Sequence, residues 1–208
     1  MKTNITRFLS FTAAACAVVL VSHLSAAAAS ITLPATNQTV CYDTAGVVIN
    51  CTGTRQDGAL RMGASWPTVR FSNNGDGTFI DNLTGLVWLS DNTCLLIATY
   101  NTFLKALDAV ANLADGQCGL TDGSVKGAWR MPNVNEAYSL FDTSKKAIAA
   151  GTPFKLGSGY NYSVVTSTTY KKNTDYLIYI SIDSTLTTVS KFAINSSLIP
   201  NIKAVRNP

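Results

Sequence analysis

The chain has 208 residues, of which 47% are hydrophobic, and its 16 Lys and Arg against 12 Asp and Glu give a net charge of +4. Its only histidine, His23, lies in the apolar N-terminal stretch, and its only glutamate is Glu136. A mature form without that stretch has no histidine, which excludes Ser-His-Asp and Cys-His catalysis and any histidine-ligated metal.

The N-terminus has the pattern of a secretory signal peptide. Two early basic residues precede an apolar run over residues 8–21, and Ala27, Ala28 and Ala29 fit the small-residue cleavage rule. We therefore expect residues 1–29 to be removed, leaving one exported domain, 30–208, that is secreted, periplasmic or on the cell surface.

Two other interpretations of this stretch are weaker. An uncleaved anchor would need roughly 20 apolar residues, and this run is shorter. Acylation at Cys16, as in a lipoprotein, is disfavoured because the apolar run continues past that cysteine. No other segment is long and apolar enough to span a membrane.

Four cysteines remain in the mature chain, and an even number in an exported protein predicts disulfides, with three pairings possible. Two β-prone runs with a turn-forming stretch between them predict a hairpin over residues 39–52, which would bring Cys41 next to Cys51. Cys94 and Cys118 are then left to pair across a predicted helix. A zinc site is disfavoured because no C-x-x-C spacing occurs.

The next elements are a loop, a hairpin and a strand. Residues 53–67 have no period and are expected to form a long loop. Strands are predicted from residue 69 to 71 and over 78–80, on either side of the Asn- and Gly-rich turn 73–77, and a buried strand follows at 85–89.

Two helices follow. The expected apolar face of the first, over 100–114, is made by residues at i, i+3, i+4 and i+7 spacing: Tyr100, Phe103, Leu104, Leu107, Val110, Ala111 and Ala114. Gly116 is expected to end this helix. The second is predicted from Asn133 to Asp142, with Pro132 before it and Glu136 placed to complete a capping box.

The last third predicts strands over 162–170, 175–182, 187–194 and 201–206, because these runs are rich in Val, Ile, Thr and Tyr. The order of strands, two helices and further strands predicts a single α+β domain with antiparallel strands and hairpins, two disulfides and a core over residues 69–206.

Several separated motifs resemble one bacterial family, the Lcl C-terminal domain family. The central motif runs from Trp129 through Arg130, Pro132 and Asn133 to Glu136, after the run from Cys118 to Gly123. Supporting motifs are Phe71–Thr78, Asp81–Trp88, Thr166–Thr168 and Val205–Arg206, so the resemblance covers about residues 41–206.

The resemblance implies a C-type-lectin-like fold, similar to that of formylglycine-generating enzymes. The family takes its name from the tail of a collagen-like adhesin, which binds sulfated polysaccharides. Two features depart from the pattern: Val165 stands where members often have Trp, and collagen-like repeats are absent.

Few residues suggest chemistry. The formylglycine-generating relatives work through free thiols, whereas the mature cysteines here are expected to be oxidised, so we expect no enzyme activity. Asn73, Asn74 and Asp76 resemble a calcium loop, but no glutamate stands twelve positions along, and turn formation explains them. No metal and no cofactor is therefore expected.

Aromatic side chains and charge bear on binding. Trp88 and Trp129 are expected in the core, whereas Trp66 lies in the predicted loop and is the freest of the three.

Residues 30–125 carry a net charge of −4 and residues 126–208 carry +6. The densest basic pairs are the candidate ligand-binding residues Lys145, Lys146, Lys171 and Lys172.

A basic C-terminal half suits an anionic partner, although a solvated lysine face without a partner would look the same. The sequence therefore favours an exported, non-catalytic lectin-like module for adhesion to anionic polysaccharide or surface glycan. The alternative is an envelope assembly protein that uses the same fold for protein–protein contacts, including contacts with further copies of itself in an oligomer. Nucleic acid is not an expected partner.

Overall fold

The computed structural model describes residues 33–95, 102–145, 147–154, 163–170, 176–182, 187–193 and 202–208. The chain divides into a unit Met1–Ile31, outside these ranges, and a unit Thr32–Pro208, to which everything below refers. The expected signal peptide 1–29 therefore lies outside the described residues. Within the described ranges, no helix has the length and apolar character needed to cross a bilayer.

The predicted hairpin is present near the start of this unit. Strands β1 (Cys41–Tyr42) and β2 (Val48–Ile49) pair antiparallel with Cys41 opposite Ile49, and the Cys41–Cys51 disulfide joins Cα atoms 5.2 Å apart. The prediction of a long loop over 53–67 is wrong at Asp57–Leu60, which form a one-turn helix, α1, that packs on β1. Gly58 allows this approach: a Cβ there would meet the Val40 carbonyl oxygen at 2.2 Å.

A four-stranded antiparallel sheet forms the centre of the domain. Its strands are β3 (Phe71–Asn73), β4 (Thr78–Asp81), β5 (Val87–Leu89) and β11 (Val205–Arg206), in the order β11-β5-β4-β3. The prediction of a buried strand at 85–89 is confirmed for Val87–Leu89, while Gly85 and Leu86 precede the strand. Val87 and Leu89 enter one hydrophobic cluster and Trp88 enters another, so β5 is buried on both faces.

Helix α2 (Phe103–Ala111) packs on the first of these clusters but is shorter than predicted. Thr102 begins it, since its hydroxyl oxygen accepts the Lys105 backbone N–H at 3.2 Å. The predicted apolar face is partly wrong. Leu104 is 70% exposed and Ala111 is also exposed, whereas the side chains that the helix and its following turn bury are Phe103, Ala106, Val110 and Leu113.

The reason is that several apolar stripes fit this sequence equally well, and the structure uses the one that includes the small Ala106, which is fully buried. Helix α2 also ends at Ala111, before Gly116, which has a φ of 81° in the following turn. The Cys94–Cys118 disulfide is formed as predicted, with Cα atoms 5.7 Å apart, so both predicted pairings are confirmed.

Helix α3 (Val134–Ser139) begins at the predicted cap, Asn133, and has the full capping box with Glu136. It does not continue to Asp142. Residues Phe141–Asp142 form strand β6, which pairs with β7 (Ala147–Ile148), a strand that the sequence analysis missed. The buried Asp142 favours the turn, because its Oδ1 accepts the backbone N–H of Ser144 at 3.0 Å.

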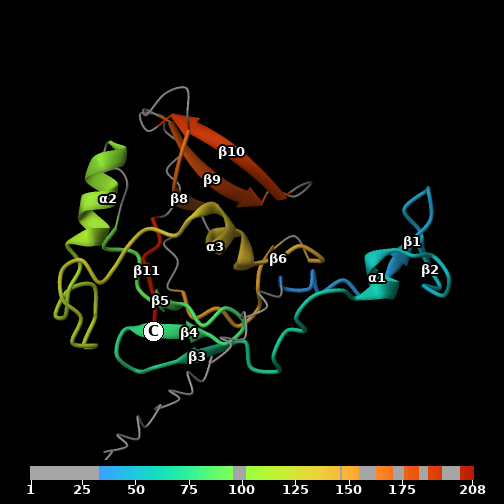
Figure 1. Ribbon diagram of the computed structural model, residues 1–208, viewed down its shortest axis with the longest axis horizontal. Helices are drawn as coiled ribbons and strands as arrows, with labels where there is room; N and C mark the ends of the chain where they lie inside the picture. The colour runs from blue at the N-terminus through green and yellow to red at the C-terminus, as the bar shows by residue number, and fades with distance from the viewer. Residues whose placement is uncertain are drawn as a thin grey trace, which may run out of the picture. The chain divides into compact units, whose positions relative to one another are not determined.

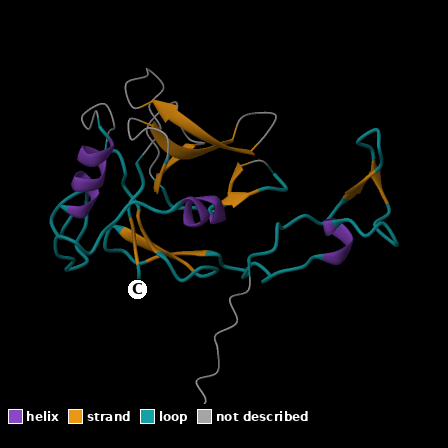
Figure 2. Cartoon of the chain, turned by 45° about the horizontal axis from the view of Figure 1, so that its top comes forward, coloured by secondary structure: helices purple, strands orange, loops and turns teal. Residues whose placement is uncertain are grey.

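A second antiparallel sheet has the order β10-β9-β8, with β8 at Ser163–Thr169, β9 at Tyr176–Ile182 and β10 at Thr187–Ala193. Helix α3 lies between this sheet and the central one (Figures 1 and 2). The second cluster fills that space with side chains from all three elements, among them Phe79, Ala137 and Ile180. The predicted α+β class with antiparallel sheets and two disulfides is confirmed.

Candidate functional site

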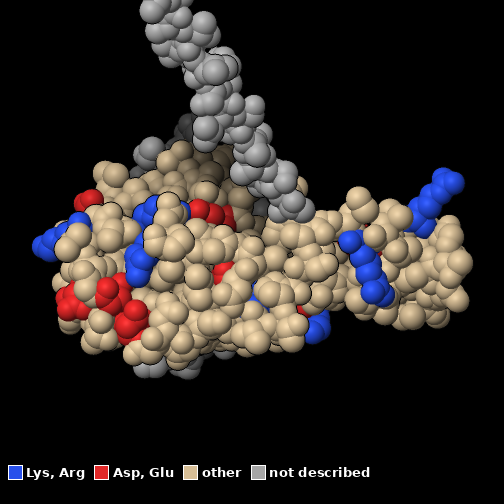
Figure 3. All heavy atoms as spheres, turned by 60° about the horizontal axis from the view of Figure 1, so that its bottom comes forward, with Lys and Arg blue, Asp and Glu red and all other residues tan. Residues whose placement is uncertain are grey.

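Of the four lysines of the sequence-predicted site, the structure describes one. Lys145 lies in the β6–β7 turn, where its side chain is 66% exposed and its Nζ is 3.9 Å from Asp142 Oδ2. Lys146, Lys171 and Lys172 lie outside the described residues. On the face shown in Figure 3, basic and acidic side chains lie among one another over the larger part of the domain, whereas the right-hand end of that face shows basic side chains alone.

The central sequence motif builds the scaffold. Trp88 and Trp129 are both buried, and the Trp129 indole N–H donates to Ser124 Oγ at 3.0 Å. Arg130 donates two hydrogen bonds of 2.7 Å to the Glu136 carboxylate. The Pro132 carbonyl accepts the Ser167 backbone N–H, which ties the start of α3 to β8.

This ion pair also changes the ionisation of its partners. Burial by itself would raise the pKa of Glu136, but hydrogen bonds from the Arg130 guanidinium and the Asn133 backbone N–H outweigh it and lower that pKa. The hydrogen bonds to Glu136 raise the pKa of Arg130 in return. Glu136 is therefore held as a carboxylate that caps a helix, which is a structural role.

The turn that resembles a calcium loop uses its side chains internally. Asn73 Oδ1 accepts the Gly75 backbone N–H at 2.9 Å, and Asp76 Oδ1 accepts the Thr78 backbone N–H at 3.0 Å. Asn74 donates to the Thr78 hydroxyl at 2.8 Å. These are the local hydrogen bonds of an Asx-rich hairpin turn.

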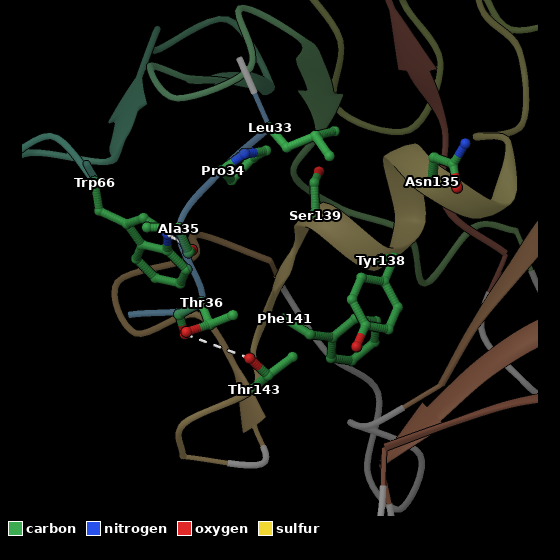
Figure 4. A pocket seen from close by; sticks show the side chains of 10 residues that line it. All are labelled: Leu33, Pro34, Ala35, Thr36, Trp66, Asn135, Tyr138, Ser139, Phe141 and Thr143. Carbon is green, nitrogen blue, oxygen red and sulfur yellow. Dashed lines mark hydrogen bonds between the residues drawn. The ribbon is translucent and has the colours of Figure 1, made fainter. Parts of the chain in front are cut away.

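A half-open pocket of about 570 Å³ lies between the N-terminal segment and α3 (Figure 4). Residues 33–36 and the Trp66 indole form one side of it, and α3 with β6 and the turn after it forms the other. Its lining residues are Leu33, Pro34, Ala35, Thr36, Trp66, Asn135, Tyr138, Ser139, Phe141 and Thr143. The volume is in the range of small-molecule binding sites.

Helix α3 is amphipathic across this boundary. Ala137 and Leu140 face the core and are fully buried. Asn135, Tyr138 and Ser139, at i, i+3 and i+4 spacing, line the pocket instead. The capping box at Asn133 fixes the start of the helix, and so the positions of the Asn135 amide and of Tyr138, which is 41% exposed, on the pocket wall.

Most polar groups of the pocket already have partners within the protein. The Thr36 hydroxyl donates to the Asp57 carboxylate, Thr143 Oγ1 donates to the Thr36 carbonyl at 3.3 Å, and Ser139 Oγ donates to the Glu136 carbonyl at 2.7 Å. The Trp66 indole N–H donates to the Ala35 carbonyl at 2.8 Å. Within the part of the chain that the structure describes, the side chains of Asn135 and Tyr138 make no hydrogen bond.

A buried arginine connects the two sides of the pocket. Arg70 pairs with Asp81 through two hydrogen bonds of 3.1 Å, and its Nη2 also donates to the Ser139 carbonyl at the end of α3. Its guanidinium lies 4.1 Å from the centroid of the Trp66 ring. Arg70 thus holds Trp66 and α3 in a fixed relation, although it does not itself line the pocket.

Sequence reasoning found one of the two aromatic residues of the pocket. Trp66 was singled out as the freest tryptophan, but Tyr138 was not considered. The helical period could have identified Tyr138. If Ala137 and Leu140 face the core, residue 138 lies on the other face of the helix.

The comparisons with known proteins give one result. The family model described as the Lcl C-terminal domain matches residues 77–201, more than half of the chain. Neither a curated protein nor a solved structure matches the chain. The match includes all of α3 and β6, while Trp66 and residues 33–36 of the pocket lie before it.

Proposed function

The chain belongs to the Lcl C-terminal domain family, and on that premise we propose that it is an exported, non-catalytic glycan-binding module with a C-type-lectin-like fold. Its ligand is an anionic polysaccharide or a surface glycan. The observation that carries the proposal is the pocket between residues 33–36 and α3, which combines two aromatic side chains with free polar groups.

The aromatic side chains supply the surface that sugars need. A pyranose ring has apolar C–H faces, which pack on aromatic rings, and polar edges, which need hydrogen-bond partners. Trp66 is held in place by its bond to the Ala35 carbonyl and by Arg70 against its ring. A fixed ring loses little conformational freedom when a ligand binds, which favours affinity.

The charge component of the proposal rests on the lysines. Lys145 stands two residues after Thr143, which lines the pocket, and its side chain is largely exposed. Lys146 follows directly, and Lys171 and Lys172 form the second basic pair of the sequence. Ammonium groups bind sulfates or carboxylates as point charges, so they select charge density rather than sugar identity.

The proposal includes no catalytic step. Each cysteine in the described ranges lies in a disulfide, and a disulfide sulfur is not a thiolate nucleophile. Export and oxidation are consistent with one another, because disulfides form outside the cytoplasm.

Heparin affinity chromatography at two salt concentrations tests this function. We expect the mature wild type to bind and to elute earlier as salt rises, because the Debye length falls to about 8 Å at physiological ionic strength. The double variant Lys145→Gln, Lys146→Gln should bind at least tenfold more weakly. The charge-matched control Lys105→Gln, Lys126→Gln, at exposed positions before α3, should bind as the wild type does.

Two outcomes would refute a charge-driven binding site at Lys145 and Lys146. Binding that salt does not weaken would exclude a charge-driven interaction. Equal loss in the test variant and in its charge-matched control would show that only net charge matters.

A second function, assembly through protein contacts, is favoured by one observation. The disulfide-closed hairpin exposes three consecutive β-branched residues: Val47 is 59% exposed, Val48 60% and Ile49 37%. Exposed apolar clusters commonly mark protein interfaces. Light scattering would support this function if the wild type self-associated and Val48→Asp did not.

A further inference from the structure

The pocket carries no charge of its own. None of its ten lining residues is Asp, Glu, Lys, Arg or His. The nearest buried cation behind its walls, Arg70, is already paired with Asp81. Lys145 lies outside the lining and beside the carboxylate of Asp142. A charged group placed in the pocket would lose water without gaining a counter-charge, which is strongly unfavourable.

The pocket also has very few hydrogen-bonding groups to offer. Among its described polar side chains only the Asn135 amide and the Tyr138 hydroxyl are without a partner. Leu33, Pro34 and Phe141 add apolar surface. A ligand that buries many hydroxyl groups here would leave most of them unsatisfied, at a cost of about 1–3 kcal/mol each.

The backbone of the opposite wall does not accept a peptide strand. Ala35 N donates to the Ala64 carbonyl at 2.9 Å, and the Leu33 carbonyl accepts the Ala64 N–H at 2.8 Å. The carbonyls of Ala35 and Thr36 accept side-chain donors, and Pro34 has no N–H. A peptide that binds by adding a strand needs an alternating run of free backbone groups, and these bonds already use most of the backbone groups of residues 33–36.

One common sugar substituent matches these properties. An acetamido group is uncharged and has one N–H donor, one carbonyl acceptor and an apolar methyl group. The Asn135 amide can donate through Nδ2 to that carbonyl or accept that N–H through Oδ1. It makes one of these two bonds at a time, because the N–H and C=O of a trans secondary amide point in opposite directions. The methyl group then contacts the apolar lining, and the sugar ring is left to pack on Trp66 or Tyr138.

We propose that this pocket binds an N-acetylated hexosamine unit of a glycan, with Asn135 as the residue that recognises the acetamido group. The inference rests on the proposed glycan-binding function and makes it specific. The pocket selects an uncharged acetylated sugar. Lys145 lies outside the pocket and contacts acidic groups on other sugar units of the same glycan.

Isothermal titration of the mature protein with three defined probes tests the inference. The trisaccharide of N-acetylglucosamine should bind at least tenfold more tightly than the trisaccharide of glucose, a difference equivalent to about 1.4 kcal/mol. The trisaccharide of glucosamine, which is cationic and lacks the acetyl groups, should also bind at least tenfold more weakly.

Two variants locate the interaction. Asn135→Ala removes the free amide without touching the helix cap and should reduce the preference for the acetylated probe to less than threefold. Tyr138→Phe removes only the hydroxyl and should retain the preference. The control Leu104→Ala, at a 70% exposed position on α2, should bind all probes as the wild type does.

The outcomes separate this inference from the function on which it rests. Equal affinity for the acetylated and glucose probes, or an unchanged preference in Asn135→Ala, would overturn the acetamido site. Retained salt-dependent heparin binding in that case would leave the glycan-binding function intact. Binding of N-acetyl-leucine amide as tightly as the acetylated trisaccharide would also overturn the inference, because an acetamido group without a sugar would then suffice.

Discussion

Lys203 gives a prediction that depends on a single buried charge. The residue lies next to β11 and is 1% exposed, with its Nζ 4.6 Å from the centroid of the Phe154 ring. Its Nζ has no hydrogen-bond partner among the described residues. Burial lowers the pKa of Lys203 from 10.5 to about 8.

The sign of the effect on stability follows from the direction of this shift. Between pH 8 and 10.5 the unfolded chain holds the Lys203 proton and the folded chain has lost it. The unfolded state therefore binds more protons in this window, so the free energy of unfolding rises with pH across it. A pKa shift of this size corresponds to about 3 kcal/mol of unfolding free energy. Any cation–π attraction between the protonated Lys203 and the Phe154 ring reduces this figure.

Substitution Lys203→Met keeps the length of the side chain and removes the titrating group. The free energy of unfolding of this variant, minus that of the wild type, should fall by about 3 kcal/mol from pH 7 to pH 10.5. Urea unfolding without reductant at several pH values measures this difference. Lys126→Met, at an exposed position, serves as the control and should show no such change. A difference for Lys203→Met that is constant with pH would refute the reasoning.

Four further predictions concern the scaffold and its cysteines. Trp129→Ala should lower the free energy of unfolding by about 3–5 kcal/mol and Asn133→Ala by about 1 kcal/mol; unchanged melting of Trp129→Ala would contradict its place in the core. Arg70→Met leaves Asp81 buried and unpaired and should cost about 3–5 kcal/mol by urea unfolding, whereas a loss below 1 kcal/mol would show that the pair does not hold the pocket walls together. Alkylation of the native mature protein should label no thiol, and a labelled cysteine would restore the possibility of thiol chemistry.

The elements predicted correctly were those fixed by local chemistry. The Asn133 cap needs only Glu136 three residues later, and the turn at 73–77 needs only its own Asn and Gly residues. The Cys41–Cys51 bridge closes across a short hairpin. In each case the residues that determine the structure are neighbours in the sequence.

Features that depend on distant residues were not predictable in the same way. Which stripe of α2 is buried depends on the surface that it meets, so Leu104 was placed wrongly. The pocket unites Trp66 with Tyr138 through Arg70, which no periodicity or motif connects. Lys203 likewise lies in a stretch predicted as an ordinary strand, and only its packing on Phe154 reveals its burial.

In the proposed function a glycan occupies the pocket beside Trp66. The protein has three tryptophans, and of their indole N–H groups only that of Trp66 lies at the pocket, whereas Trp88 and Trp129 are buried in the core. Titration with the trisaccharide of N-acetylglucosamine, followed by ¹H–¹⁵N NMR of the indole signals, should shift the Trp66 signal and leave the other two in place, with assignment from Trp66→Phe. Binding that leaves the Trp66 signal unmoved would contradict a glycan site at Trp66. Failure of both this probe and heparin to bind would contradict the glycan-binding function.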